Sequence, residues 1–309
     1  MSTKDLLGIE ELSAADITAY LDEADAFKRR SPRRRSELKD KTVALVFYEN
    51  STRTRSSFEL AAKRLSAEVL ALPVQASSVA KGENLLDTLR TVEAMGVDLF
   101  VLRHPDSGAA RLAARGLRVP LVNAGDGTHE HPTQALLDLH TLREKKGRLA
   151  GLKVVYVGDI LHSRVARSGI FGLTKLGARV AVCGPPTLVP EAAASLGAEV
   201  HHDLRRALKD ADAVVALRLQ LERQKENLLP SIAEYASLYG LTAERLEWAK
   251  PDCLVMHPGP MNRGIEISDE VADGTRSAIL AQVENGVYVR MAVLARLLSG
   301  KKARSKAAR

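Results

Sequence analysis

The chain has 309 residues, of which 45% are hydrophobic and 4% aromatic, and its formal net charge is +7. That length and apolar content suffice for two domains with full cores, while the few aromatic residues argue against a stacking surface for single-stranded nucleic acid. No apolar run is long enough to cross a bilayer and the first residues lack an apolar signal core, so we expect a cytoplasmic protein with no membrane partner.

Two basic segments carry much of the positive charge. The segment from Lys28 to Ser36 holds six positive residues, and the final nine residues hold five. We interpret them as a solvated loop and a frayed tail, with a nucleic-acid surface as the alternative that no groove-reading motif accompanies. Cys183 and Cys253 both lie in apolar strand-like runs, which favours reduced, buried thiols over a disulfide or a metal site.

The first half of the chain alternates helices and strands. A first helix is predicted to open at Ser13, where "SAAD" places an acid three positions after the cap. This alternation is typical of a parallel sheet with helices on its faces. The β-branched runs that we interpret as strands lie at 42–48, 67–73, 97–103 and 119–125.

The second half begins with a long predicted helix over 132–146. Pro132 suits a first helical turn, and Gly147 suits a helix end. A final apolar helix, predicted over 277–299, has no strand after it. Between these helices the alternation resumes, with strand-like runs at 153–159, 178–185, 212–218 and 252–258.

These patterns predict an α/β fold with two doubly wound parallel-sheet domains joined by interdomain helices. The first domain is predicted over 1–134 and the second over 150–286. The C-terminal stretch 287–309 is expected to pack back onto the first domain, because an apolar helix needs a surface that covers it.

Several familiar signatures of catalysis are missing. The sequence has no G-x-G-x-x-G after a strand and no P-loop, and no Ser-His-Asp order, metal-ligand cluster or pair of carboxylates stands out. We therefore expect no cofactor and no metal. The remaining polar residues suit a site that works by positioning its substrates and by stabilising charge.

The stretch "FYENSTRTRSSFEL", from Phe47 to Leu60, carries the strongest local signal for an anion site. Hydroxyl and arginine side chains from Ser51 to Arg55 stand where a buried strand is predicted to end and a helix to begin. A helix start offers unpaired N–H groups and a positive dipole end. Together with hydroxyls and guanidinium groups, these features predict a phosphate site.

Other predicted strand ends also carry groups that suit an anion. Each such residue alone is more often a surface, capping or packing residue, and Ser77, Ser78 and Lys81 form a segment that can equally be a plain polar loop. Their convergence at strand ends predicts two anionic ligands that meet between the two domains. The candidates are Arg103, His131, Gln134, Arg164, Arg218, Gln220, Arg223 and the loop Pro258, Gly259 and Pro260.

Four segments in order along the chain, "STRTR", "HPTQ", "LRLQLER" and "HPGP", resemble the transcarbamoylase family over roughly residues 4–300, and within it the aspartate branch. The resemblance implies transfer of a carbamoyl group from carbamoyl phosphate to the α-amino group of L-aspartate. The products would be N-carbamoyl-L-aspartate and phosphate, in de novo pyrimidine biosynthesis. The first domain would bind carbamoyl phosphate and the second would bind aspartate.

The resemblance also implies a role for each matching residue. Arg53, Thr54, Arg103 and His131 would be catalytic, and Thr54, Arg103 and His131 would polarise the carbonyl oxygen. Arg53 would neutralise the departing phosphate, which can itself take the amine proton. Carbamoyl phosphate would be bound by Ser51, Thr52, Arg53, Thr54, Arg103, His131, Gln134, Pro258, Gly259 and Pro260, and aspartate by Lys81, Arg164, Arg218 and Gln220.

The family further implies a homotrimer with shared active sites, in which Ser77 and Lys81 enter from the neighbouring subunit. A regulatory chain or a dihydroorotase can accompany such trimers. One departure is Gly259, where many members carry a larger apolar residue. The chain also lacks the cysteine and the Ser-Met-Gly segment typical of ornithine transcarbamoylases, which favours an aspartate acceptor.

Two alternative functions remain at this stage. One is a transcarbamoylase that acts on another amino-acid acceptor. The other is a non-catalytic scaffold of a pyrimidine-pathway complex, against which the presence of Arg53, Arg103 and His131 argues.

Overall fold

The computed structural model describes residues 4–30, 35–72, 84–220 and 231–299 of the chain. These residues form two compact units. Unit 1 comprises the described residues up to Leu136 and from Asn285 onwards, and unit 2 runs from Leu137 to Glu284. The fold class predicted from the sequence is confirmed, because each unit is a parallel sheet flanked by helices.

The sheet of unit 1 has the strand order β2-β1-β3-β4, and all of its strand pairs are parallel. Its central strands β1 and β3 are almost wholly buried, which explains why they are mostly continuous apolar runs instead of alternating patterns. The strands are β1 (Thr42–Phe47), β2 (Glu68–Leu72), β3 (Leu99–His104) and β4 (Leu121–Asp126).

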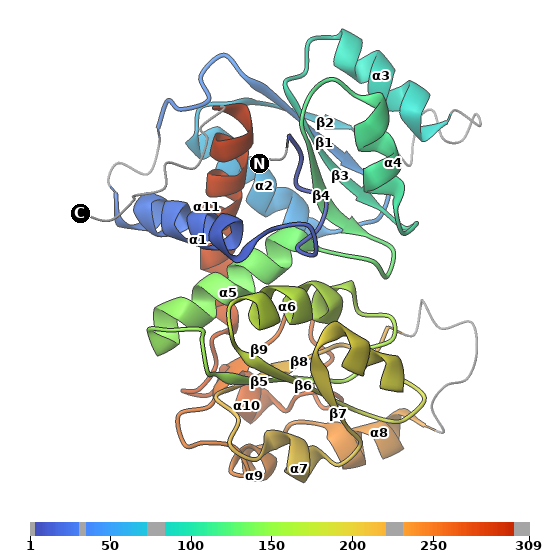
Figure 1. Ribbon diagram of the computed structural model, residues 1–309, viewed down its shortest axis with the longest axis vertical. Helices are drawn as coiled ribbons and strands as arrows, with labels where there is room; N and C mark the ends of the chain where they lie inside the picture. The colour runs from blue at the N-terminus through green and yellow to red at the C-terminus, as the bar shows by residue number, and fades with distance from the viewer. Residues whose placement is uncertain (1–3, 31–34, 73–83, 221–230, 300–309) are drawn as a thin grey trace. The chain divides into compact units, whose positions relative to one another are not determined.

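Helices cover both faces of this sheet (Figure 1). Helices α3 (Leu85–Ala94) and α4 (Ala109–Gly116) pack on one face, where Leu89 and Ala113 join an apolar cluster with Phe100 of β3. The other face is covered by α1 (Ala14–Arg29), α2 (Thr52–Arg64) and the part of α11 (Ile279–Leu298) that belongs to unit 1.

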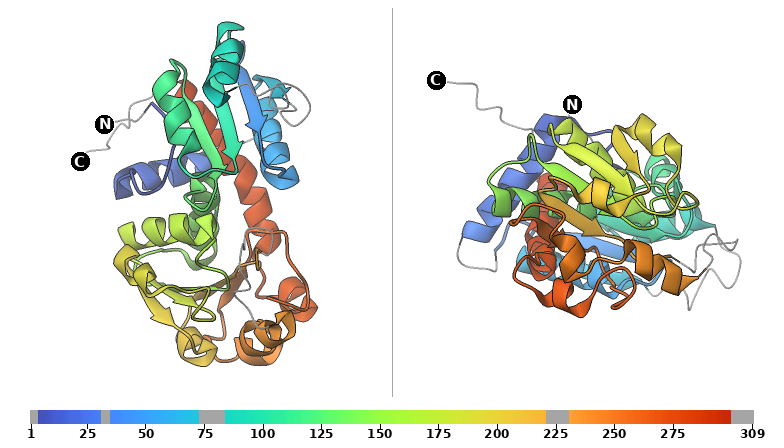
Figure 2. Two further views of the ribbon diagram at one scale, coloured as in Figure 1. Left: turned by 90° about the vertical axis from the view of Figure 1, so that its right-hand side faces the viewer. Right: turned by 90° about the horizontal axis from the view of Figure 1, so that it is seen from below.

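Cation–π contacts join the helices on that second face of unit 1. The guanidinium of Arg290 on α11 lies 5.1 Å from the ring centroid of Phe58 on α2, and Arg296 lies 5.1 Å from Tyr20 on α1. Arginine over an aromatic face is favourable, most of all where water is excluded. Figure 2 shows α11 as one continuous helix in its left view.

The sheet of unit 2 has the strand order β7-β6-β5-β8-β9 and is also parallel throughout. The sequence reasoning missed one of its strands, β7. That strand is short, lies at the sheet edge and is only partly buried, so its apolar signal is weak. The strands are β5 (Lys153–Val157), β6 (Arg179–Cys183), β7 (Ala198–His201), β8 (Ala213–Ala216) and β9 (Leu254–Met256).

The two faces of this sheet are covered by different helices (Figure 1). Helix α6 (Arg164–Lys175) packs closely on β5, because a Cβ on Gly169 would overlap the hydroxyl of Tyr156. Apolar residues of the opposite face form one cluster with the helices that cover it. These are α7 (Leu204–Leu208), α8 (Ile232–Tyr239), α9 (Ala243–Leu246) and α10 (Asp269–Asp273), and the 3-10 helix Glu191–Leu196 precedes β7.

Two predicted helix boundaries are confirmed. Helix α1 begins after Ser13, which forms a capping box with Asp16. Helix α5 (Pro132–Lys146) ends before Gly147, whose φ of 72° lies in the left-handed region that glycine enters without strain. Units 1 and 2 divide inside α5 and inside α11. Among the described residues, no helix is long and apolar enough to span a membrane.

Cys183 and Cys253 are free and buried, as expected from their apolar surroundings. Burial raises the pKa of each thiol to about 12. Because the thiolate is the reactive form, we predict that neither cysteine reacts with a disulfide reagent at pH 8 in the folded protein. Absorbance of the released thiol would measure this, and rapid modification before unfolding would contradict it. The same titration in denaturant should count two thiols.

Candidate active site

The chain of unit 1 reverses its direction of winding at β1. It passes from β1 to β2 on one side and then crosses to β3 on the other side of β1. Such a switch point leaves a crevice beyond the carboxyl ends of the two adjacent strands, where open α/β sheets bind ligands. Phe47 at the end of β1 is paired in register with Arg103 at the end of β3. The loops that carry the candidate residues of unit 1 therefore start from neighbouring strands.

Helix α2 begins directly beyond β1. Its first turn is open, in the sense that its N-cap side chain does not cap it within the described structure. Its N-cap residue is Ser51, whose side chain makes no capping hydrogen bond within the described structure, and no acidic residue lies in its first turn. By contrast, Ser13, Asn84 and Ser163 each cap the helix that follows with their side chains. The start of α2 thus lacks both a side-chain cap from Ser51 and an acidic residue, and its positive dipole end favours an anion.

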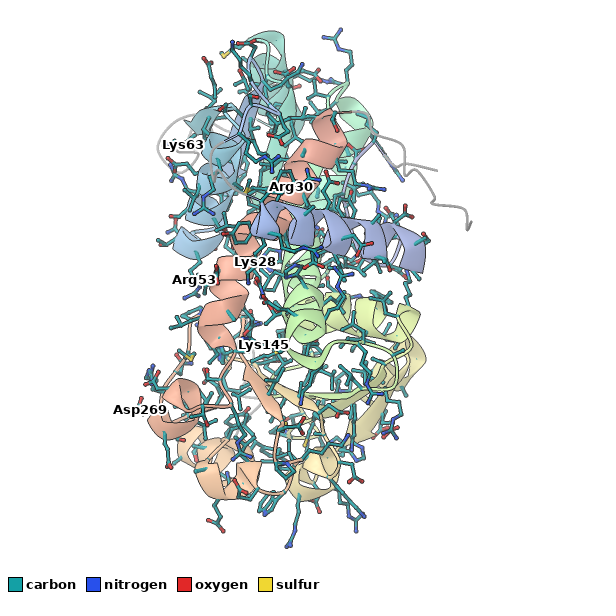
Figure 3. All side chains as sticks on the ribbon, turned by 90° about the vertical axis from the view of Figure 1, so that its left-hand side faces the viewer. Lys28, Arg30, Arg53, Lys63, Lys145 and Asp269 are labelled. Carbon is teal, nitrogen blue, oxygen red and sulfur yellow. The ribbon has the colours of Figure 1, made fainter. Side chains whose placement is uncertain are left out.

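The side chains at the start of α2 differ in exposure. Thr54 is buried, whereas Thr52 and Arg53 are exposed. Figure 3 labels Arg53 at the start of α2 and Lys63 towards the other end of the helix. An exposed guanidinium beside a helix start can approach a phosphate with two N–H groups at once.

Arg103 is held at the strand end by groups on both sides. Its Nε lies 2.9 Å from a carboxylate oxygen of Glu49, and its Nη1 donates to the carbonyl of Ala124 at 3.4 Å. Glu49 follows β1 and Ala124 lies on β4, so Arg103 connects the loop after β1 with strand β4, which flank its own strand on opposite sides. The sequence reasoning did not single out Glu49.

The loop from β4 to α5, which carries His131, is organised by Asp126. The carboxylate of Asp126 accepts hydrogen bonds from the backbone N–H groups of Gly108 and Glu130, and it also pairs with Nδ1 of His129. Burial alone would raise the pKa of Asp126, but the hydrogen bonds from His129, Asn123 and Gly108 together hold that pKa below its ordinary value. Asp126 therefore acts as a charged centre for this loop.

His131 and Gln134 stand where that loop enters α5. His131 directly precedes the helix, and its carbonyl accepts the backbone N–H of Gln134 at 3.0 Å. Both residues are largely buried. His131 thus stands immediately before the first turn of α5, and Gln134 lies within that turn.

Unit 2 has its own switch point, between β5 and β8. Arg164 is the first residue of α6, after β5, and Arg218 and Gln220 follow β8. The two loops are joined directly, because the side-chain amide of Gln220 donates to the carbonyl of His162 at 3.2 Å. The sequence candidates on this side are thus brought to the same edge of the sheet of unit 2.

A buried acid also organises the loop after β5. The carboxylate of Asp159 accepts the backbone N–H of His162 at 3.1 Å and lies 2.9 Å from Nδ1 of that histidine. Asp159 is fully buried, and Arg164 lies close behind in sequence with only a few per cent of its surface exposed. The sequence analysis did not single out the pair of Asp159 and His162.

The loop of Pro258, Gly259 and Pro260 follows β9 at the same edge of unit 2. Gly259 has a φ of 69°, in the left-handed region where glycine is the least strained residue. This backbone requirement gives a physical reason for the glycine that departs from the family pattern. Three further candidates, Ser77, Lys81 and Arg223, lie outside the described residues.

One group of possible metal ligands escaped the sequence analysis. Ligand atoms of Glu10, His129 and Glu130 lie within 4.8 Å of one another. The carboxylate of Glu130 already accepts the backbone N–H groups of Ile9 and Glu10, and Nδ1 of His129 pairs with Asp126. The group therefore fastens the N-terminal segment to the loop after β4.

Comparisons with known proteins agree with this geometry. Residues 4–144 match a family model described as the aspartate/ornithine carbamoyltransferase carbamoyl-P binding domain, and residues 150–297 match the Asp/Orn binding domain of the same family. An aspartate carbamoyltransferase catalytic subunit from Pelotomaculum thermopropionicum is 57% identical over 300 residues, covering 96% of this chain and 97% of the relative.

Solved structures of both branches of that family resemble the chain. Aspartate transcarbamoylase from Trypanosoma cruzi, in complex with carbamoyl phosphate and aspartate, aligns with a TM-score of 0.85 and 32% identity, covering 94% of this chain and 95% of the other. Ornithine carbamoyltransferase from Pyrococcus furiosus aligns with a TM-score of 0.86 and 34% identity, covering 96% and 98%. Fold similarity alone therefore does not separate the two acceptors.

The role of Asp126 can be tested by its dependence on pH. We predict that Asp126→Asn lowers the free energy of unfolding by about 2 kcal/mol at pH 7, because it removes charge-assisted hydrogen bonds from a buried loop. The folded-state pKa of Asp126 is depressed. Its contribution is therefore complete above the unfolded pKa of about 3.9 and is lost as the pH falls through the folded pKa.

Denaturant unfolding of both proteins between pH 7 and pH 3 would measure this difference. The difference in the free energy of unfolding between wild type and Asp126→Asn should become smaller below about pH 4. Asp106→Asn is the matched control, because the Asp106 side chain is 82% exposed. A gap that stayed constant down to pH 3, or an equal loss in the control, would show that the charge of Asp126 does not organise the loop.

Proposed function

Because the chain belongs to the aspartate/ornithine carbamoyltransferase family, we propose that its strand-end residues divide the work of carbamoyl transfer between them. The chain is an enzyme that transfers the carbamoyl group of carbamoyl phosphate to the α-amino group of L-aspartate. The products are N-carbamoyl-L-aspartate and phosphate, and the reaction is a step of de novo pyrimidine biosynthesis. The residue roles that follow are our proposal.

The phosphate of carbamoyl phosphate is bound at the start of α2. The supporting observation is the open first turn beyond β1, where Ser51 leaves the helix without a side-chain cap. Backbone N–H groups there, with the hydroxyls of Ser51, Thr52 and Thr54 and the guanidinium of Arg53, match the oxygen atoms of a phosphate. Residues 1–134 form the carbamoyl-phosphate-binding domain in this proposal, and the C-terminal helix from residue 287 packs on it.

The carbonyl group of the substrate is polarised by Thr54, Arg103 and His131. Thr54 follows β1, Arg103 lies near the end of β3 and His131 follows β4. All three therefore stand at the edge of the sheet of unit 1 where its parallel strands end. Glu49 and the Ala124 carbonyl restrain Arg103, and Asp126 shapes the loop that leads to His131. Donors fixed in this way stabilise a developing oxyanion without having to reorganise.

The chemical step then needs no dedicated protein base. The uncharged α-amine of aspartate attacks the carbonyl carbon, a C–N bond forms and the carbonyl oxygen gains negative charge. The tetrahedral intermediate collapses, the C–O bond to phosphate breaks and the departing phosphate takes the amine proton. Arg53 neutralises the departing phosphate, and Gln134 with the carbonyls of the Pro258–Pro260 loop orients the carbamoyl NH2.

Aspartate is bound by residues of unit 2, proposed as the domain 150–286. Arg164, Arg218 and Gln220 all lie at the carboxyl edge of its sheet, and Gln220 is tied to the loop that carries Arg164. Two carboxylates on the acceptor call for cations, and arginine binds carboxylates through paired N–H groups. Lys81 completes this set in the proposal.

An assembly with shared sites belongs to the same proposal. We infer a cytoplasmic homotrimer in which Ser77 and Lys81 act in the neighbouring subunit's site, with or without a regulatory chain or a dihydroorotase. Family membership supports the trimer. The two free cysteines are ordinary for a protein of a reducing compartment.

The phosphate and oxyanion roles predict large losses of turnover. Arg53→Ala and His131→Ala should each lower kcat by about 10²- to 10³-fold, since each removes a donor to developing charge. A product assay for carbamoyl aspartate measures this, and circular dichroism checks that the variants fold. Lys63→Ala is the matched control, because Lys63 is a cation on the same helix whose partner is Glu59. Wild-type turnover in either site variant would refute its assigned role.

The acceptor is tested directly with a panel of amino acids. Wild-type protein should carbamoylate L-aspartate and leave L-ornithine unmodified. Arg218→Ala and Gln220→Ala should raise the KM for aspartate by about tenfold or more while kcat changes less, because these residues bind an unreacting part of the acceptor. Product formed from ornithine at a comparable rate would contradict the assignment of unit 2.

Shared active sites predict complementation between inactive subunits. Arg53→Ala and Lys81→Ala proteins should each be nearly inactive, and mixed trimers should recover part of the activity because some sites then receive both native residues. Reversible dissociation of the mixture followed by the product assay measures this. Mixed trimers verified by native mass spectrometry that stay inactive would place Lys81 in its own subunit's site.

A further inference from the structure

A buried histidine controls the backbone of the loop after β9. The side chain of His257 is completely buried, and its Nδ1 accepts the backbone N–H of Gly259 at 2.8 Å. The loop of Pro258, Gly259 and Pro260 is thus folded over the histidine that introduces it. Since a peptide N–H and the carbonyl that precedes it share one plane, this bond also fixes the direction of the Pro258 carbonyl.

The same bond fixes the tautomer of His257. A nitrogen that accepts a hydrogen bond carries no proton, so the proton of the neutral ring lies on Nε2. That nitrogen faces Glu266, whose Oε1 lies 3.1 Å away and accepts its hydrogen bond. A carboxylate at Nε2 therefore holds the ring in the one neutral form that can accept from Gly259.

Glu266 also fixes the far end of the loop. Its Oε1 accepts the backbone N–H of Asn262 at 2.6 Å in addition to the imidazole. One carboxylate oxygen thus ties residue 257 to residue 262 and closes the loop on both sides of Pro258–Pro260. Glu266 is 1% exposed, so water does not compete for these bonds.

A second pair of buried side chains fixes the start of the loop. Oε1 of Gln282 accepts the backbone N–H of His257 at 2.9 Å, and its amide nitrogen donates to Asp138 at 2.6 Å. Because Asp138 accepts from the amide nitrogen, the Gln282 oxygen must face His257. All of these residues lie within unit 2.

We propose that His257, held in its Nε2–H form by Glu266, is a positioning residue that aims the loop carbonyls at the NH2 group of carbamoyl phosphate. The inference rests on the proposed function, which gives that loop its contact with the carbamoyl group. It explains what fixes the geometry of the loop, and it names the property of the site that depends on that geometry. That property is discrimination in favour of an acyl phosphate with two N–H donors.

A purely structural role would not explain why the network ends on this loop. An imidazole and a carboxylate lose their hydration when buried, and apolar side chains of similar volume would fill the same space at lower cost. Here the imidazole, the carboxylate and the glutamine each bind a backbone N–H of residues 257–262. These buried polar groups therefore fix the direction of the peptide groups in this one loop.

Acetyl phosphate is the probe that separates positioning from stability. It has a methyl group where carbamoyl phosphate has NH2, so it offers the same phosphate and carbonyl but no N–H donors. The measurement is the ratio of its inhibition constant against carbamoyl phosphate to the KM of carbamoyl phosphate. Sites built to bind an N–H group discriminate strongly against analogues that lack it, so the wild-type ratio should be large.

Two isosteric variants test which nitrogen of His257 matters. In His257→Asn the amide oxygen can replace Nδ1 and accept from Gly259, whereas in His257→Gln the amide nitrogen can replace Nε2 but leaves Gly259 without its acceptor. We expect His257→Gln to lower the discrimination ratio by about tenfold or more, and His257→Asn by no more than about threefold. Affinity for inorganic phosphate should stay unchanged in both.

Glu266 supplies a second test should a histidine variant fail to fold. Glu266→Gln keeps an acceptor for Asn262 and His257 and should retain the ratio, whereas Glu266→Ala should lose it. Asp212→Asn is the matched control, because Asp212 is a buried carboxylate that accepts from Lys153 and Lys250 at the opposite edge of the sheet. It should lower the melting temperature without altering the ratio.

The outcomes separate this inference from the proposed function. Wild-type protein that forms carbamoyl aspartate, with variants that lose only stability and keep the wild-type ratio, would overturn the positioning role alone. Wild-type protein that makes no carbamoyl aspartate would overturn the proposed function. A wild-type ratio near one would overturn both the loop's contact with the carbamoyl group and the role of His257.

Discussion

Parallel strands end at the same edge of their sheet, and this constraint governs where the polar side chains of both units can gather. In each unit the chain winds outward from its first central strand in both directions, so two loops diverge at one point of that edge. Arg103 in unit 1 and Arg164 in unit 2 both lie at such points. The fold therefore assembles each set of cations from segments that are distant in sequence.

A buried carboxylate paired with a histidine recurs in these strand-end loops. In each case the carboxylate also accepts a backbone N–H from the loop, so the pair supports the backbone of the loop. Burying such charges costs desolvation free energy, and only several well-formed hydrogen bonds offset that cost. The pairs are Asp126 with His129 after β4, Asp159 with His162 after β5, and Glu266 with His257 after β9.

Prediction from sequence succeeded where a signal is local. The capping box at Ser13 and the helix Pro132–Lys146 both depend on residues within one or two turns. Prediction from sequence failed for the residues that hold the candidate site residues in place. Glu49 beside Arg103 is an ordinary polar residue until the register of β1 and β3 places the two together.

The sequence by itself determined the α/β class, the likeness to the transcarbamoylases and the presence of residue types that suit anions, because apolar periodicity and short motifs are written into neighbouring positions. Tertiary structure alone decided the strand order and the partners of each candidate. Gln282 reaches Asp138 across 144 positions, and Glu266 reaches His257 across nine. No local pattern encodes such pairs, because they exist only once packing has brought distant backbone segments within hydrogen-bonding distance.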